Sequence, residues 1–212
     1  MKRLTILLLV LVSCFCAFAT PGYVSKVNQN SLFALYETDL YYDGSKNEYG
    51  LYIYSKLDFG VNPYYYFVLS ENDFSTFRKT VEKAIEWKNV ARSNEVTIDK
   101  EIPNSSLSLE WYYYSSGDWI KNETDVKLDF SFSASRASGT WLGDMELYSL
   151  DMKVINGERT QVISYIDGRI GEQWDYVEGA ALTELSNATS KKTVDTGIKK
   201  LKVQDNADSL FN

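Results

Sequence analysis

The chain has 212 residues, with 22 basic and 29 acidic side chains and a net charge of −7 at pH 7. It contains no histidine, which excludes Ser-His-Asp and Cys-His catalysis and metal sites built on imidazole ligands. An acidic chain repels phosphate backbones, so we expect no nucleic-acid partner. The sequence also lacks the glycine-rich phosphate and dinucleotide motifs, and the Gly-x-Ser-x-Gly and Ser-x-x-Lys motifs of hydrolases.

Residues 1–19 have the pattern of a secretory signal peptide. A basic start is followed by an uncharged run of about 15 residues and by the small residues Ala17 and Ala19. The run is shorter than the roughly 20 apolar residues that span a bilayer, and no other stretch approaches that length. We therefore expect cleavage between Ala19 and Thr20, export of residues 20–212, and no transmembrane helix after cleavage.

A lipid anchor is the alternative for this leader. Residues 11–14, Leu-Val-Ser-Cys, resemble the lipobox of bacterial lipoproteins, in which Cys14 would be acylated. The residues after Cys14 are apolar, whereas a lipoprotein usually continues with a polar tether, so the sequence favours cleavage after Ala19. Cys14 and Cys16 are the only cysteines, and the exported chain therefore folds without disulfides, as suits a bacterial envelope protein.

The first expected hairpin joins strands within 33–42 and 48–59. Asp43-Gly44 supplies the positive φ of a tight turn between them. In the second strand Leu51, Ile53, Leu57 and Phe59 alternate inward. The turn 43–48 offers oxygen atoms but is not a calcium loop of the EF-hand type, so we expect a plain hairpin and no metal site.

An amphipathic helix is expected over about 73–92. Its apolar residues recur at helical spacing, Ser70, Asn72 or Asp73 can cap its start, and Ser93-Asn94 ends it. Lys88 falls within the apolar stripe. It either points into a site or, as the sequence favours, extends past the edge of the core to solvent.

The C-terminal half is expected to be mainly β. Residues 126–134 alternate between apolar and polar, and Asn156-Gly157 and Asp167-Gly168 divide 145–177 into a three-stranded meander. A second helix is expected between 178 and 202, followed by a loosely held tail at 203–212. The fold class is thus α+β, a mainly antiparallel sheet or sandwich of about eight to ten strands in one exported domain.

The sequence contains two runs of three tyrosines, at 64–66 and 112–114, which could form a binding surface or cover the faces of the sheet. The run 64–66 is apolar on both faces, which predicts a central strand covered on both sides. In the second run, the period of two places Tyr113 with Trp111 in the core and Tyr112 and Tyr114 outside. Tyr52 and Tyr54 point outward in the same way. Tyr52, Tyr54, Tyr112 and Tyr114 either form an exposed binding strip or, as the sequence favours, stabilise the sheet by cross-strand pairing or lie buried under the helix and loops.

The sequence favours a non-catalytic binding module, exported to the bacterial envelope or secreted, for a glycan or a protein ligand. It requires no cofactor, and no residue is assigned a catalytic role. The alternative is a carboxylate-dependent hydrolase acting on carbohydrate, which needs only two acidic side chains across a cleft. Its candidates are Glu110, Asp118, Glu146, Asp151 and Asp175.

Overall fold

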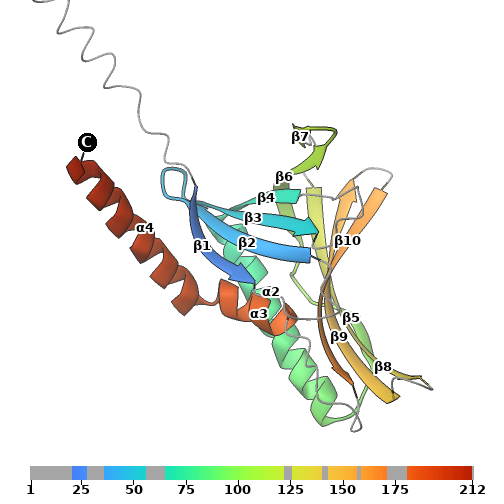
Figure 1. Ribbon diagram of the computed structural model, residues 1–212. Coiled ribbons are helices and arrows are strands. Elements are labelled where there is room, and N and C mark those ends of the chain that lie inside the picture. The colour runs from blue at the N-terminus through green and yellow to red at the C-terminus, as the bar shows by residue number, and fades with distance from the viewer. Residues whose placement is uncertain are drawn as a thin grey trace, which may run out of the picture.

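The computed structural model describes residues 21–27, 36–55, 65–121, 126–139, 143–156, 159–170 and 181–211 (Figure 1). Ten strands and three helices follow one another along the chain. They are β1 (Gly22–Val27), β2 (Tyr36–Asp43), β3 (Glu48–Ser55), β4 (Tyr65–Ser70), α2 (Glu71–Ser93), β5 (Ile98–Glu101), β6 (Leu107–Ser115), β7 (Asp118–Lys121), β8 (Val126–Gly139), β9 (Gly143–Asn156), β10 (Arg159–Ile170), α3 (Ala181–Thr189) and α4 (Lys191–Phe211).

The strands are antiparallel and follow the order β1-β2-β3-β4-β6-β8-β9-β10, with β5 on β8 and β7 on β6. β6 connects the N-terminal strands β1–β4 to the C-terminal strands β8–β10. Its middle pairs with β4, from Glu110 to Tyr113, and its first residues, Leu107 to Leu109, pair with β8. The α+β class with a mainly antiparallel sheet, expected from the sequence, is confirmed.

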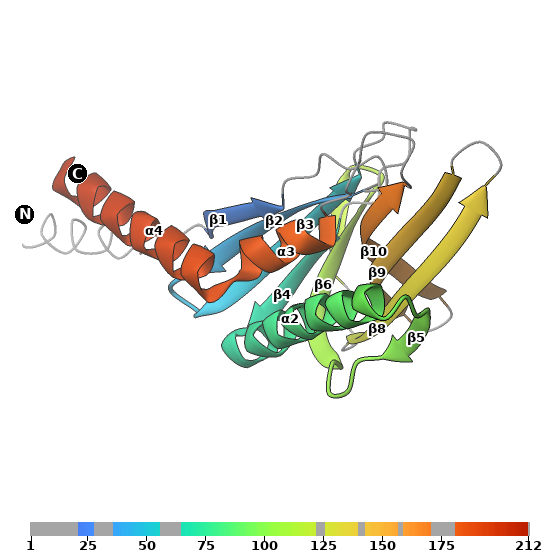
Figure 2. The same ribbon diagram turned by 90° about the horizontal axis from the view of Figure 1, so that it is seen from below.

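The helix α2 forms as its sequence predicts. Ser70 caps its first turn by accepting a hydrogen bond from the Asp73 amide, and Asn94 follows its last residue. Its apolar stripe packs on the sheet, with Phe74 stacked 4.0 Å from Tyr49 and Phe77 5.5 Å from Phe130, measured between ring centroids. Figure 2 shows α2 and α3 lying in front of the sheet, so these two helices cover one of its faces and enclose the core.

The C-terminal region contains two helices where the sequence predicted one. Ser190 separates α3 from α4, and its hydroxyl accepts a hydrogen bond from the Thr193 amide at the start of α4. α4 packs against β1 at Gly197, which lies under Val24. Residues 203–211 of the predicted loosely held tail continue this helix, and Val203 is 68% exposed. None of the described helices has the length and hydropathy of a membrane span.

The expected turn at Asp167-Gly168 is wrong, whereas the expected antiparallel pairing of the strands before and after Asn156-Gly157 is confirmed. β10 runs through Asp167 and Gly168, which pair with Tyr148 and Leu147 of β9. The remainder of the third predicted strand, 171–177, lies outside the described residues. Asp167 is 2% exposed, and its carboxylate is engaged by other elements instead of by a turn.

The prediction that Lys88 reaches solvent is also wrong. Lys88 is 7% exposed, and its Nζ lies 2.7 Å from Asp167 Oδ2 and 3.0 Å from Thr183 Oγ1. The second carboxylate oxygen, Oδ1, accepts hydrogen bonds from the Leu182 and Thr183 amides at the start of α3. A buried ammonium requires a charged partner, and this partner lies 79 residues away in the sequence.

Candidate functional site

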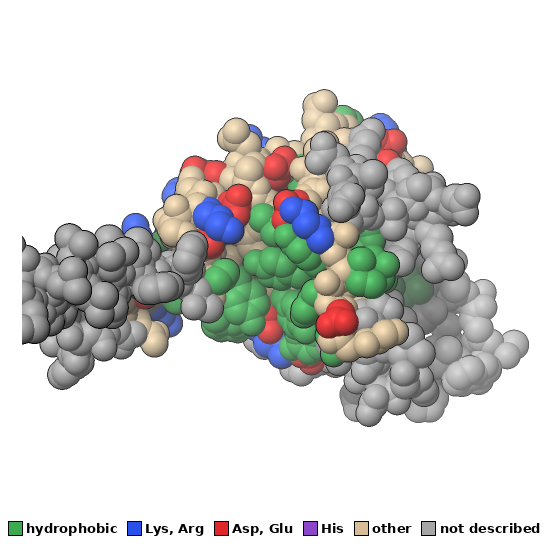
Figure 3. Space-filling model, turned by 90° about the horizontal axis from the view of Figure 1, so that it is seen from above, with side chains coloured by type: hydrophobic (Ala, Val, Ile, Leu, Met, Phe, Trp, Pro, Cys, Tyr) green, Lys and Arg blue, Asp and Glu red, His purple; other side chains and the backbone are tan. Residues whose placement is uncertain are grey.

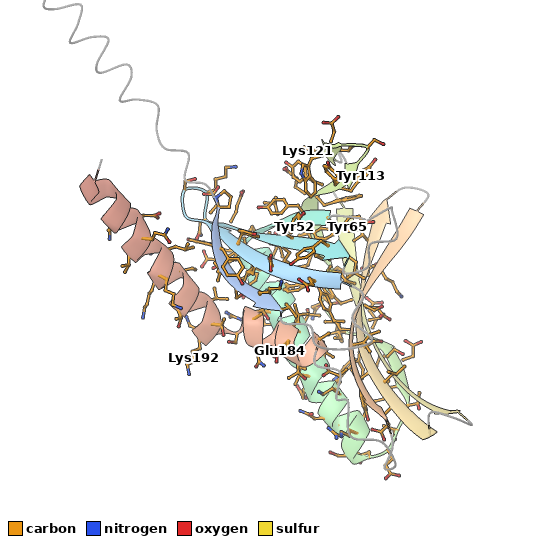
Figure 4. All side chains as sticks on the ribbon, viewed as in Figure 1. Tyr52, Tyr65, Tyr113, Lys121, Glu184 and Lys192 are labelled. Atoms are coloured by element: carbon orange, nitrogen blue, oxygen red, sulfur yellow. The ribbon has the colours of Figure 1, made fainter. Side chains whose placement is uncertain are left out.

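Strand register gathers aromatic side chains on the sheet face that α2 and α3 leave open. Tyr52 of β3 is the partner of Tyr66 on β4, and Tyr66 is the partner of Tyr112 on β6. Tyr112 in turn pairs with Lys121 of β7. Because side chains alternate along each strand, these four point to one side. Figure 4 shows Tyr52 and Lys121 on the side of the sheet away from the helices.

A pocket of about 610 Å³ lies on this open face. Figure 3 shows the same face, with hydrophobic side chains gathered in its middle and charged side chains around them. The volume falls within the roughly 300–1,000 Å³ typical of small-molecule sites. The pocket is lined by Pro21, Asp43, Lys46, Glu48, Tyr49, Tyr52, Tyr66, Val68, Glu110, Tyr112 and Trp119.

The ring of Tyr66 lies over Gly50 in the floor of the pocket. A Cβ at Gly50 would fall 2.6 Å from both Cε2 and Cζ of Tyr66, so only glycine leaves room for the ring in this position. Burial raises the pKa of the Tyr66 hydroxyl, and the negative charges of Asp43 and Glu48 raise it further. The hydroxyl therefore stays protonated at neutral pH and remains available as a hydrogen-bond donor.

Trp119 reaches the pocket from a short hairpin. Ser116 and Gly117 adopt φ values of 53° and 97°, and this tight turn folds β7 back along β6. The Trp119 ring lies 5.5 Å from Tyr114 on the adjacent strand and 5.8 Å from Tyr52 on β3. It is 45% exposed, so one indole ring forms a wall of the pocket and still presents surface to solvent.

The carboxylates of Glu110 and Asp43, which line the pocket, are paired or hydrogen-bonded to neighbouring residues. Glu110 Oε2 lies 2.8 Å from Lys121 Nζ, and Glu110 also accepts the hydroxyl proton of Tyr112. Lys121 and then Tyr112 lower the pKa of Glu110 by these hydrogen bonds. Hydrogen bonds from Ser45 likewise lower the pKa of Asp43. Both carboxyls are therefore ionised at neutral pH and act as hydrogen-bond acceptors.

The four predicted tyrosines all lie on the open face, as two pairs on either side of β4. Tyr52 and Tyr112 line the pocket, whereas Tyr54 and Tyr114 lie beside it. The Tyr54 hydroxyl donates a hydrogen bond to Glu37 Oε2 at 2.6 Å and accepts a hydrogen bond from Lys26 Nζ.

The remaining tyrosine predictions divide. Tyr113 packs against the core 5.5 Å from Trp111, as its parity predicts. The prediction that β4 is covered on both faces holds for one face only. Tyr65 and Phe67 are buried beneath the helices, but Tyr66 lines the pocket on the other side, which none of the described helices covers.

The other candidate residues are not brought together. Asp118 is exposed, Glu146 accepts a hydrogen bond from Tyr148, and Asp151 accepts one from Ser164. In the turn 43–48, Asp43 Oδ1 accepts bonds from the amides of Ser45 and Lys46, and the described residues contain no acidic cluster suited to a metal ion. Outside the described residues lie Cys14, Ala19, Thr20, Leu57, Phe59 and Asp175.

Sequence reasoning missed Trp119 and the role of Tyr66. A signal for Trp119 was present, because a two-residue turn at Ser116-Gly117 places it directly opposite Tyr114. No comparable signal existed for Tyr66, since its neighbours on β3 and β6 are known only from the strand order.

Comparisons with known proteins identify neither a family nor a function for this chain. No protein-family model matches the chain, and neither the curated proteins nor the solved structures gave a significant match.

Proposed function

We propose that this protein is a non-catalytic glycan-binding module, exported to the bacterial envelope or secreted, and that the pocket on the open sheet face holds a sugar ring. One observation carries the proposal. Aromatic rings from three different strands, Tyr52, Tyr112 and Trp119, surround one pocket that also contains carboxylates. Aromatic faces pack against the apolar face of a sugar ring, and carboxylates accept hydrogen bonds from its hydroxyl groups.

A glycan fits this pocket better than the flat face of a protein partner. The pocket is concave and is lined by aromatic rings together with charged side chains, which suits a single sugar ring that enters from solvent. A neutral sugar also leaves the Glu110–Lys121 pair intact, whereas a charged ligand would compete with it. The signal peptide at 1–19 supports export, where envelope glycans are the accessible partners.

Binding without turnover is supported by the pKa values of two carboxyl groups in the pocket, those of Asp43 and Glu110. A glycosidase needs one carboxyl group with a raised pKa, because that group protonates the leaving oxygen. The pKa values of Asp43 and Glu110 are both lowered, so these two groups supply no such proton. We therefore propose the binding module ahead of the carboxylate-dependent hydrolase.

A glycan array probed with the purified protein tests this proposal. We expect a defined class of glycan to bind, and Trp119→Ala and Tyr112→Ala each to weaken that binding by about tenfold or more. Tyr23→Ala is the matched control, because Tyr23 is 50% exposed and lies outside the pocket. Equal loss in the control variant, or binding that survives both pocket substitutions, would contradict the proposal.

A further inference from the structure

We infer that the ligand is an oligosaccharide chain and that it extends from the pocket onto an aromatic track beside it. The track consists of Tyr114, Trp119, Tyr52 and Tyr54. This inference rests on the proposed function, and it specifies the length of the ligand that the same site takes.

The track is continuous across three strands. Ring centroids are 5.5 Å apart from Tyr114 to Trp119, 5.8 Å apart from Trp119 to Tyr52, and 5.4 Å apart from Tyr52 to Tyr54. Two of these rings, Trp119 and Tyr52, also line the pocket. A chain bound in the pocket therefore meets further aromatic surface wherever it leaves between them.

Exposure distinguishes two rings of this track, Trp119 and Tyr114, from pairs that serve only to stabilise the sheet, while Tyr52 and Tyr54 are half-buried. Trp119 is 45% exposed and Tyr114 is 38% exposed, whereas the aromatic residues of the opposite face, such as Phe67, are fully buried. Aromatic rings left in contact with water at the rim of a pocket are characteristic of binding surfaces.

The far end of the track carries fixed polar groups. Lys26 Nζ lies 2.5 Å from Glu37 Oε2 and 2.9 Å from the hydroxyl of Tyr54, and the side chains of Lys26 and Glu37 are 35% and 20% exposed. These bonds hold the Tyr54 ring in place before any ligand binds, which lowers the entropic cost of stacking on it. They also provide a donor and an acceptor beside the ring for the hydroxyl groups of a second sugar unit.

The test measures affinity against chain length. We would titrate the protein with three series of linear glycans, the β-1,3-linked glucans, the β-1,4-linked glucans and the β-1,4-linked N-acetylglucosamine oligomers, each from the monosaccharide to the hexasaccharide. In the series that binds, we expect affinity to rise about tenfold or more between the monosaccharide and the hexasaccharide. Tyr54→Ala should remove most of this gain and leave the affinity for the monosaccharide unchanged.

Variants separate this inference from the proposed function. Tyr54→Phe keeps the ring and should retain most of the gain, whereas Tyr112→Ala should weaken the short and the long ligands alike. Equal affinity for monosaccharide and hexasaccharide, or an equal loss for both in Tyr54→Ala, would overturn the inference and leave the binding module standing. Absence of binding in all three series would overturn both.

Discussion

Lys88 Nζ lies 2.7 Å from Asp167 Oδ2, and both side chains are buried. This pair joins α2 to β10, and the second oxygen of Asp167 accepts the amides of Leu182 and Thr183 at the start of α3. One carboxylate therefore fixes both helices that cover the sheet beneath the pocket. Because the positive end of a helix dipole also lies at Asp167, the ion pair and the helix start stabilise the same charge.

The first prediction concerns this pair. Lys88→Met leaves the Asp167 carboxylate buried without its cation and should lower the free energy of unfolding by about 3–5 kcal/mol. Urea denaturation followed by circular dichroism measures this change. Adding Asp167→Asn to Lys88→Met removes the uncompensated charge, so the double variant should be more stable than Lys88→Met alone.

An exposed pair provides the control for this experiment. Lys191 and Asp195 lie one helical turn apart on α4 and are exposed, so Lys191→Ala should change stability by less than about 0.5 kcal/mol. A similar loss of stability for Lys88→Met and Lys191→Ala would show that the buried Lys88–Asp167 pair does not hold α2 and α3 on the sheet.

The second prediction concerns the pocket floor. Gly50→Ala places a methyl group where the Tyr66 ring now lies, so the ring must move into the pocket. Because the ring can swing at its far end, we expect a small loss of stability and a clear loss of glycan affinity. Adding Tyr66→Ala should relieve the clash and recover stability without recovering full affinity. Unchanged binding in Gly50→Ala would contradict this geometry.

The third prediction concerns the docking of α4 on β1. A Cβ at Gly197 would fall 2.8 Å from the Val24 carbonyl oxygen, a backbone atom of β1 that can give way only if the strand itself shifts. Gly197→Ala should therefore destabilise the protein by about 1–3 kcal/mol, although alanine favours helix more than glycine does. Limited proteolysis should cut α4 faster in this variant. Thr196→Ala, at an exposed neighbouring position, should leave the cleavage rate unchanged.

The fourth prediction concerns pH. Burial raises the pKa of Asp39 above its ordinary value of 3.8, Lys26 opposes this shift, and Glu37 adds to it. The Oδ1 atom is buried and accepts no hydrogen bond from the described residues. A raised pKa means that the folded state binds the proton more tightly, so Asp39 contributes stability at low pH that is lost as the pH rises through the folded-state pKa.

Asp39→Asn removes this titration. The variant should be more stable than the natural protein at pH 7, and its advantage should shrink as the pH falls towards 4. Tyr23, Tyr41 and Tyr54 also interact electrostatically with Asp39, and they stay neutral throughout this range because burial raises the pKa of all three hydroxyls. Thermal unfolding at several pH values measures the difference. A constant difference between the two proteins at all pH values would contradict the assignment to Asp39.

Local patterns in the sequence predicted much of the fold. Period-two alternation located β3 and β8, turn residues located the hairpins after Asp43 and Asn156, and helical spacing with a Ser70 cap located α2. The failures had a long-range cause. Asp167-Gly168 has the residue types of a turn, but in the structure both residues belong to β10, where Asp167 forms a buried ion pair with Lys88 of α2.

The candidate site could be predicted only in part. Parity along single strands correctly placed Tyr52 and Tyr112 on an outward face. It could not show that β4 lies between their strands, so it predicted Tyr66 to be a core residue, whereas Tyr66 lines the pocket. The pocket depends on strand order, which one sequence does not contain.

The central claim is that the pocket on the open sheet face binds a glycan. Isothermal titration of the glycan selected by the array should compare the natural protein with Tyr112→Ala/Trp119→Ala and with the control Tyr23→Ala, which is 50% exposed and lies outside the pocket. We expect the double variant to remain folded and to lose at least about a hundredfold in affinity, while the control binds normally. Normal binding by the double variant would contradict the central claim.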